Sequence, residues 1–212
     1  MSRRQNRTRL VFDTSLSTLP EPDIRTILRA ADPLITTAGR AMLIKVLRGS
    51  RAQEVLKHGM DDNPCYGAYQ GRSEAEVLAM VDWMILNDYL GLDFDGDLPL
   101  LFYSQRGWRI EREIVANELI DGFDKLLAQS APPYDMLYLK DRSRDLILLL
   151  LGILHERSDP KYVPILEAWA QVDYAKVRKE IARVIGHLGA SASASHSAAT
   201  SSTPAATCPP VS

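Results

Sequence analysis

Four consecutive residues have the types and the order of a phosphate-binding turn. Arg48, Gly49, Ser50 and Arg51 combine two guanidinium groups with a glycine and a hydroxyl. Ser50 follows one helical pattern and precedes another, so its hydroxyl and the free backbone N–H groups of the next helix are expected at a positive helix end. A phosphate is the ligand that such an arrangement favours. The sequence therefore predicts a phosphate contact here, against the simpler interpretation that Arg48 is a surface arginine.

A second turn carries similar chemistry. Gln70, Gly71, Arg72 and Ser73 precede another helical pattern, and Ser73 with Glu76 has the Ser-x-x-Glu form of a capping box. Ser73 thus has two interpretations, a helix cap or a phosphate ligand, and for Ser73 alone the cap is favoured. Gln70 and Arg72 remain candidate phosphate contacts beside it.

The charges are segregated along the chain, although the net charge is only −2. Residues 1–10 carry four arginines and no acid, and residues 36–58 carry a net charge of +4. Residues 59–103 reverse the sign, with a net charge of −8. A basic face could bind phosphates, whereas the simpler interpretation is two solvated faces of opposite sign.

Several chemistries are excluded by the residues present. The only two cysteines, Cys65 and Cys208, are 143 positions apart, and the four histidines have no ligand spacing, so no disulfide framework, metal or cofactor is predicted. No glycine is followed by lysine, which excludes a phosphate loop of the nucleotide-hydrolysing type. The Asp-Gly-Asp run at residues 95–97 is better explained as a turn than as a calcium loop. No catalytic constellation stands out, and we expect no enzyme.

The composition is that of one globular domain with a small appendage, since 46% of 212 residues are hydrophobic and 25% are charged. The longest apolar run, residues 146–154, is less than half of the roughly 20 residues that a membrane span needs. No secretory signal is readable at the N-terminus. We expect a cytoplasmic protein with no membrane partner.

The elements expected before residue 104 are those of a winged helix-turn-helix. A flexible basic arm, residues 1–20, leads into helical patterns and then into two apolar strands around the Asp95-Gly96 turn. This order is typical of nucleic-acid-binding domains that read with their third helix. The helices are expected at residues 23–31, 38–47, 50–59 and 73–87, and the strands at 89–94 and 98–103.

A helical segment is expected after the wing. Ser104 can cap a long helix, which completes a domain at 21–130, and Ala131-Pro132-Pro133 is the predicted boundary. Residues 134–188 hold three helical patterns, two of which look like one HEAT-type pair. One such pair cannot bury its own face, so it must pack on the preceding helix or on the winged helix, of which we expect the latter. Residues 189–212, rich in Ala, Ser and Pro, are expected to be a disordered tail.

The winged-helix part resembles a known family over roughly residues 36–115. The Leu-Arg-Gly-Ser run at 47–50 is the most specific match, and Tyr66-Gly67, the run Trp83 to Leu90 and Gln105-Arg106-Gly107-Trp108 extend it. Together they resemble the RQC domain of RecQ-type DNA helicases, and most of all the small stand-alone bacterial proteins of the RQC-minor type. The resemblance implies a DNA-binding winged helix active in repair or replication, with phosphate contacts at Arg48, Gly49 and Ser50.

Three departures from that family limit what the resemblance implies. The motor domains and the zinc-binding cysteines are absent from this sequence, and the wing tip is acidic, with Phe94 one step behind it. The resulting hypothesis is a mainly α, non-catalytic adaptor that binds duplex or junction DNA with little sequence preference. The alternative is a protein-interaction module that uses the acidic face and the C-terminal helices. The candidate DNA-binding residues are Arg48, Gly49, Ser50, Arg51, Gln70, Arg72 and Ser73.

Overall fold

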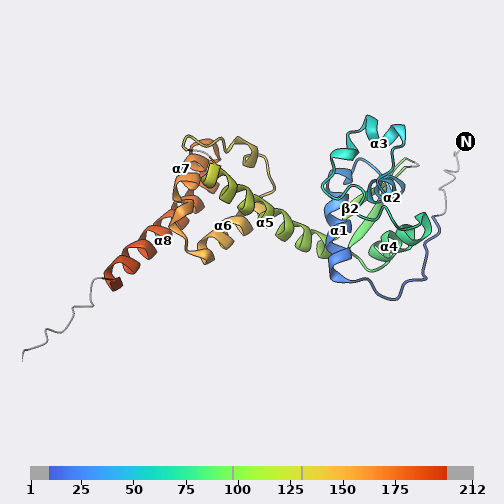
Figure 1. Ribbon diagram of the computed structural model, residues 1–212, viewed down its shortest axis with the longest axis horizontal. Helices are drawn as coiled ribbons and strands as arrows, with labels where there is room; N and C mark the ends of the chain where they lie inside the picture. The colour runs from blue at the N-terminus through green and yellow to red at the C-terminus, as the bar shows by residue number, and fades with distance from the viewer. Residues whose placement is uncertain (1–9, 97, 130, 200–212) are drawn as a thin grey trace, which may run out of the picture. The chain divides into compact units, whose positions relative to one another are not determined.

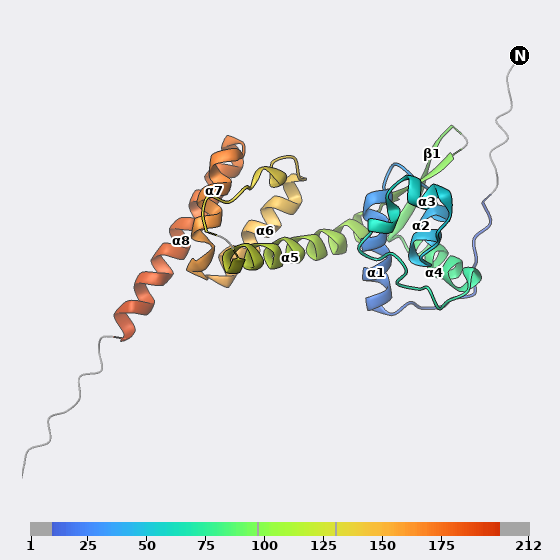
Figure 2. The ribbon, with the colours of Figure 1, turned by 45° about the horizontal axis from the view of Figure 1, so that its top comes forward.

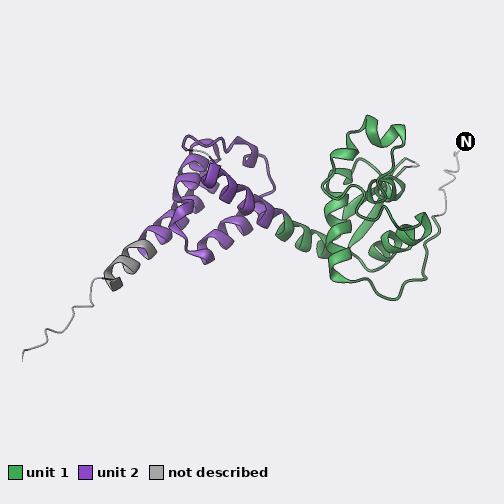
Figure 3. Ribbon diagram, viewed as in Figure 1, with its two compact units in different colours: residues 1–114 green, residues 115–212 purple. Residues whose placement is uncertain are grey.

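The computed structural model describes residues 10–96, 98–129 and 131–199, with the side chains of 191–199 left out. Two compact units make up the chain, residues 1–114 and 115–212 (Figure 3). The division falls inside one long helix rather than at the predicted boundary of residues 131–133. The first nine residues of the basic arm, Asp97 of the wing tip and the end of the tail, with Cys208, lie outside the described residues.

The first unit is a helical body with a hairpin (Figure 1). Fully buried apolar side chains from three of its helices, among them Leu28, Leu43 and Val81, form its core. Burial of such side chains stabilises each by about 1.5–3 kcal/mol, which fixes the helices against one another. The helices are α1 (Glu21–Ala31), η1 (Asp32–Leu34), α2 (Arg40–Leu47), α3 (Gln53–Lys57), η2 (Met60–Asp62) and α4 (Glu74–Leu86).

The hairpin follows α4 and extends away from the helices of this unit (Figure 2). Strands β1 (Leu90–Asp95) and β2 (Leu98–Tyr103) are antiparallel, with Leu92 opposite Leu101. The segment before α2 lies along the other edge of β2, where Thr36 N donates to Leu101 O at 2.8 Å and Leu101 N to Ala38 O at 2.9 Å. Helices followed by this hairpin confirm the predicted winged helix-turn-helix fold.

Helix α5 (Gln105–Gln129) begins at the end of the hairpin. Ser104 caps it as predicted, since its hydroxyl accepts a hydrogen bond from Gly107 N at 3.0 Å. Gly107 lies so close to the hairpin that a Cβ there would be 1.9 Å from the carbonyl oxygen of Tyr89. The absence of a side chain at this position therefore permits the contact between α5 and the hairpin.

A buried carboxylate ties the start of the chain to the helical body. Asp82, on α4, is fully buried; one of its oxygens pairs with Arg40 Nη1 and the other accepts a hydrogen bond from Asp13 N at 2.8 Å. Arg40 also donates from Nη2 to Val11 O at 3.1 Å, and its guanidinium lies 5.3 Å from the centre of the Phe12 ring. The pair thus joins α2, α4 and residues 11–13.

This ion pair bears on two predictions. In the described part of the basic arm, residues 10–20, backbone groups are hydrogen-bonded to Asp82 and Arg40, and Leu19 is buried. The sequence also assigns Arg40 to a basic face and Asp82 to an acidic one. They neutralise each other inside the unit, so neither contributes to a solvent-exposed face.

We predict that Asp82→Ala lowers the free energy of unfolding by about 3–5 kcal/mol, because it leaves Arg40 without its counter-charge in a mostly buried position. Urea denaturation followed by circular dichroism measures the loss. Asp61→Ala removes an exposed carboxylate on η2 and is expected to change stability by no more than about 0.5 kcal/mol. Equal losses in the two variants would contradict this role of the buried pair.

The second unit is helical, as predicted, and has its own core. Ile120 and Phe123 of α5 are buried in it with Tyr162 and Trp169, and the Phe123 and Trp169 rings lie 6.5 Å apart. The helical pair is therefore completed by the preceding helix, which is the other of the two packing alternatives that the sequence offers. Its helices are η3 (Leu137–Leu139), α6 (Arg144–Arg157), η4 (Pro160–Tyr162), α7 (Val163–Val172) and α8 (Ala175–Ala199).

The start of the predicted disordered tail, residues 189–199, is helical instead. Helix α8 continues through residues 189–199, where disorder is expected from composition. Alanine has the highest helix propensity of all residues, and here the Ala-rich run follows directly on a helix that is already formed. Extending an existing helix avoids the unfavourable nucleation step that an isolated segment would face.

Candidate nucleic-acid interface

The Leu-Arg-Gly-Ser run ends a helix rather than beginning one. Gly49 has φ of +68°, and it follows Arg48, the C-cap residue of α2. Gly49 N donates to Val46 O and Ser50 N to Lys45 O, both at 2.9 Å, which is the Schellman pattern of a helix C-terminus. These two N–H groups are therefore occupied, and the prediction that they are free to bind phosphate is wrong.

The second predicted turn lies directly beside this one. Gly67 N donates to Val46 O at 2.9 Å and Tyr69 N to Leu47 O at 2.7 Å, so residues 67–69 lie alongside the end of α2. The two backbones approach so closely that a Cβ on Gly49 would lie 3.0 Å from Gly67 Cα. The fold thus brings together the two segments that the sequence indicates separately.

Ser50 holds the loop between α2 and α3. Its hydroxyl accepts a hydrogen bond from Ala52 N at 3.3 Å, and its carbonyl oxygen accepts one from the Tyr66 hydroxyl at 3.0 Å. The next helix begins only at Gln53, with Ala52 in the N-cap position. Ser50 is therefore not the helix cap that the sequence predicts, although its hydroxyl retains a proton to donate.

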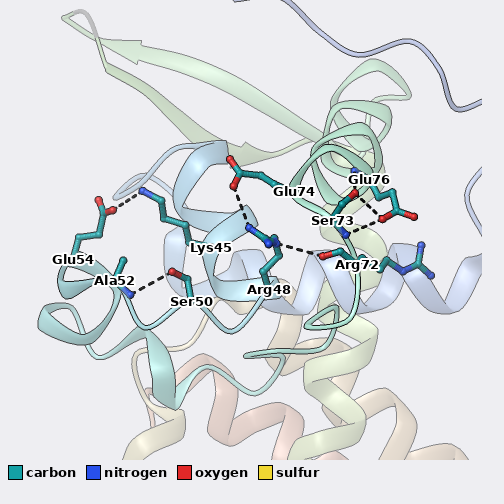
Figure 4. Close-up of polar contacts among 9 residues, drawn as sticks. All are labelled: Lys45, Arg48, Ser50, Ala52, Glu54, Arg72, Ser73, Glu74 and Glu76. Carbon is teal, nitrogen blue, oxygen red and sulfur yellow. Dashed lines mark hydrogen bonds and ion pairs between the residues drawn. The ribbon is translucent and has the colours of Figure 1, made fainter.

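Arg48 reaches from the end of α2 to the start of α4 (Figure 4). Its Nη1 lies 3.0 Å from Glu74 Oε2, and its Nε donates to Arg72 O at 3.4 Å. The side chain is 35% exposed and that of Glu74 is 75% exposed, so the pair is open to solvent. An exposed pair of this kind stabilises a fold by only about 0–1 kcal/mol, which leaves the guanidinium available to a stronger anion.

Arg72 points away from Arg48 (Figure 4). Its guanidinium lies 5.1 Å from the centre of the Tyr69 ring and 4.0 Å from Asp23 Oδ2. The two arginine side chains therefore do not converge on one point, although their backbones are adjacent. Gln70, two positions before Arg72, is exposed.

The remaining cations of residues 36–58 differ in their availability. Lys45 is paired with Glu54 at the surface, whereas Arg51 and Lys57 are exposed. In the part of the chain that the structure describes, neither Arg51 nor Lys57 has a carboxylate partner. Arg51 therefore offers the most accessible positive charge next to the 47–50 turn.

Ser73 is the N-cap of α4, as favoured from the sequence. Its hydroxyl accepts a hydrogen bond from Glu76 N at 3.2 Å, and Glu76 Oε2 accepts one from Ser73 N at 2.8 Å, which completes the capping box. The hydrogen bonds from the Ser73 side chain and backbone lower the pKa of Glu76 below its ordinary value. The carboxylates of Glu74 and Glu76 at this helix end make it a less favourable phosphate site than the sequence suggests.

We predict that Ser73→Ala lowers the free energy of unfolding by about 1 kcal/mol through loss of the cap. The pKa of Glu76 should rise, because one of the hydrogen bonds that stabilises its charged form is removed. The lowered pKa of Glu76 stabilises the folded state at pH values above the pKa of this group in the unfolded chain, and this stabilisation is lost as the pH falls. The difference in the free energy of unfolding between Ser73→Ala and the wild type should therefore become smaller at acid pH. NMR titration of the Glu76 carboxyl and urea denaturation measure both effects.

The matched control is Ser73→Thr, which keeps the hydroxyl. Its stability and the pKa of Glu76 are expected to stay close to those of the wild type. A Glu76 pKa that does not move in Ser73→Ala would contradict the capping interaction.

One functional partner was missed from the sequence. Glu74 is the ion-pair partner of Arg48, but the two are 26 positions apart, and nothing in local spacing links them. The acidic residues in the first turn of α4, which the capping box predicts, were the only local indication that a basic side chain could pair there. Among the described residues no group of three His, Cys, Asp or Glu is arranged to hold a metal, and no helix there is long and apolar enough to cross a membrane.

The first unit is a winged helix-turn-helix domain by its helices, hairpin and turn geometry. Residues 22–118 match the family model of the RQC domain. The chain is also 32% identical over 81 residues to the ATP-dependent DNA helicase RecQ of Bacillus subtilis (strain 168). Residues 22–118 thus match an RQC domain of the RecQ type, which supports the resemblance to that domain and extends the match into α1.

The match covers different shares of the two proteins. It spans 38% of this chain but only 13% of the helicase. No solved structure matches the chain. The similarity therefore concerns the RQC domain and not the helicase as a whole.

Proposed function

We propose that this protein binds DNA through its RQC domain, contacting the phosphate backbone of duplex or branched DNA with little sequence preference. The proposed role is non-catalytic, in repair, replication or recombination, and the proposed compartment is the cytoplasm. The observation that carries the proposal is the solvent-accessible guanidinium of Arg48. It is held at a fixed turn inside a segment of the RQC type.

The candidate contacts lie on two adjacent turns. Arg48, Ser50 and Arg51 belong to the turn after α2, and Gln70, Arg72 and Ser73 to the turn before α4. The proposed phosphate donors are side chains, because the N–H groups of Gly49 and Ser50 are occupied within the fold. Gly49 serves by shaping the turn that presents Arg48.

Glu74 is expected to weaken this interaction. A phosphate that takes Arg48 must displace the Glu74 carboxylate, which then lies near the DNA as a repelling charge. The proposed interface is therefore one of moderate affinity, in which the ion pair competes with the backbone. The acidic wing residues Asp93 and Asp95 make strand separation by the wing tip a less favourable proposal.

We predict that the full chain binds a fluorescein-labelled duplex and a junction of the same base composition, with similar affinities for scrambled sequences. If about four to five phosphates are engaged, the log–log dependence of affinity on salt has a slope on the order of −3 to −5. Fluorescence anisotropy titrations at several salt concentrations measure it. Binding absent at low salt, or insensitive to salt, would contradict the proposal.

We predict that Arg48→Ala weakens DNA binding by about 1.5 kcal/mol, roughly tenfold, because a charge-assisted hydrogen bond is lost. Glu74→Gln is expected to strengthen binding, since it removes the competing carboxylate and keeps the side-chain shape. Arg25→Ala removes another surface arginine, paired with Glu21 on α1, and is expected to leave the affinity unchanged. The same anisotropy assay compares all three.

Thermal melting separates binding from folding. All three variants remove only surface pairs, so their melting temperatures are expected to stay near that of the wild type. A lower melting temperature in Arg48→Ala with unchanged affinity would assign Arg48 a structural role instead.

The second candidate function is protein binding through the acidic face. It is favoured by apolar side chains exposed on β2, where Leu98 is 68% exposed and Phe102 39%, next to the carboxylates of Asp93 and Asp95. Two results together would favour this candidate. The wild type would fail to bind DNA, and a protein that co-purifies with the wild type would be lost in the double variant Leu98→Ser/Phe102→Ser. The C-terminal helices are the other proposed surface for a protein partner.

A further inference from the structure

The second unit carries a cationic groove at the first turns of α6 and α8. Two neighbouring depressions, of about 230 and 210 Å³, share Arg144, Lys176 and Val177 in their walls. Lys140, Arg142 and Tyr174 line the first depression, and Lys179 and Leu148 line the second. Because the walls are shared, the depressions form one continuous surface feature, here called the α6–α8 groove.

The cations of the α6–α8 groove are available to a ligand. Within the described residues none of its five cations has an ion-pair partner, in contrast to Arg40, Lys45 and Arg48 of the first unit. Four of the five are exposed, and Lys140 is partly so. The five are Lys140, Arg142, Arg144, Lys176 and Lys179.

The two acidic residues of the groove are occupied elsewhere. The buried carboxylate of Asp173 accepts hydrogen bonds from Trp169 Nε1 and Tyr174 N, both at 2.6 Å. Glu180 Oε2 lies 3.0 Å from Arg183 Nε. The groove therefore presents a clear excess of positive charge to solvent.

Two helix N-termini lie at the groove. Arg144 is the first residue of α6, after the N-cap Ser143, and Lys176 lies in the first turn of α8. The partial positive charge at the start of α8, whose first turn has no acidic residue, favours anions and adds to the charge of the side chains, whereas Asp145 offsets it in the first turn of α6. The groove is thus suited to a ligand that carries several negative charges in a row.

An aromatic ring lies in the same wall. Tyr174 is 58% exposed, and Lys140 Nζ lies 5.2 Å from the centre of its ring. An exposed tyrosine among cations is the combination by which proteins hold single strands, with phosphates on the cations and a base stacked on the ring. A peptide of aspartate and glutamate alone would use the cations but has no flat ring system to place on Tyr174.

We propose that the α6–α8 groove binds single-stranded nucleic acid, with successive phosphates along its five cations and one base stacked on Tyr174. This site lies in the second unit, outside the RQC domain, and goes beyond the function proposed above. It does not depend on DNA binding by the first unit.

The test uses the full chain and a labelled oligothymidine of about 15 nucleotides, within the range of known single-strand site sizes. Arg144→Gln/Lys176→Gln is expected to weaken binding at least tenfold. Its salt slope should be smaller by about 1.4, as expected for two lost phosphate contacts on a single strand. Tyr174→Leu is expected to weaken binding about fivefold or more through loss of stacking.

The matched control is Lys125→Gln/Arg178→Gln, which removes two exposed cations of the same unit outside the groove and should leave binding within about twofold. Because Arg144, Lys176 and Tyr174 are exposed, the variants are expected to fold like the wild type, and thermal melting checks this. Oligothymidine binding that is absent in the wild type, or equal in the groove variant and the control, would overturn the proposal. Competition by polyglutamate as effective as that by unlabelled oligothymidine would also overturn it.

Arg48→Ala separates this inference from the function of the RQC domain. It is expected to weaken duplex binding and to leave oligothymidine binding unchanged, whereas the groove variant does the reverse. If Arg48→Ala alone weakens oligothymidine binding, the strand is bound by the first unit and the groove proposal is wrong. If duplex binding is absent but the groove variant still loses oligothymidine, only the RQC proposal fails.

Discussion

The contact between the backbones at Gly49 and Gly67 is the constraint on which the candidate interface depends. Gly49 ends α2 in a left-handed conformation, and the neighbouring chain leaves little room for a side chain there. Because Gly67 N and Tyr69 N are hydrogen-bonded to the last carbonyl groups of α2, the turn before α4 cannot move independently of the turn after α2. The position of Arg48 relative to α4 follows from this packing of main chain on main chain.

Charge pairing then decides which cations can act on a ligand. Arg40 is held by a buried carboxylate and stabilises the fold, while Arg48 is held by an exposed one that a phosphate can replace. The difference lies in burial, because removing water from an ion pair makes it costly to break. The cations of the α6–α8 groove, such as Arg144 and Lys176, have no such partner among the described residues and are open to solvent. Formal charge along the chain hides these distinctions entirely.

Local patterns in the sequence were sufficient to predict features whose hydrogen bonds join residues close together in the chain. The capping box of Ser73 and Glu76, the cap of Ser104 and the hairpin around Gly96 all follow from contacts a few positions apart. Gly49 does end a helix, but Ser50 was misjudged as the start of the next one, because serine is common at helix starts and only the partners of its N–H and hydroxyl groups decide. The link of Arg48 to Glu74 and the burial of Asp82 were out of reach, since both depend on distant contacts. The division inside α5 was missed because a helix gives no local sign that its two halves enter different cores.

The junction at Gly107 carries a consequence for how such domains diverge. A Cβ at this position would overlap the Tyr89 carbonyl oxygen, which is main chain and cannot be replaced by mutation. Compensating substitutions elsewhere cannot relieve the overlap without separating α5 from the hairpin. A lineage that keeps this junction must therefore keep its glycine. That glycine is a fixed point from which distant relatives can be aligned when little else in their sequences agrees.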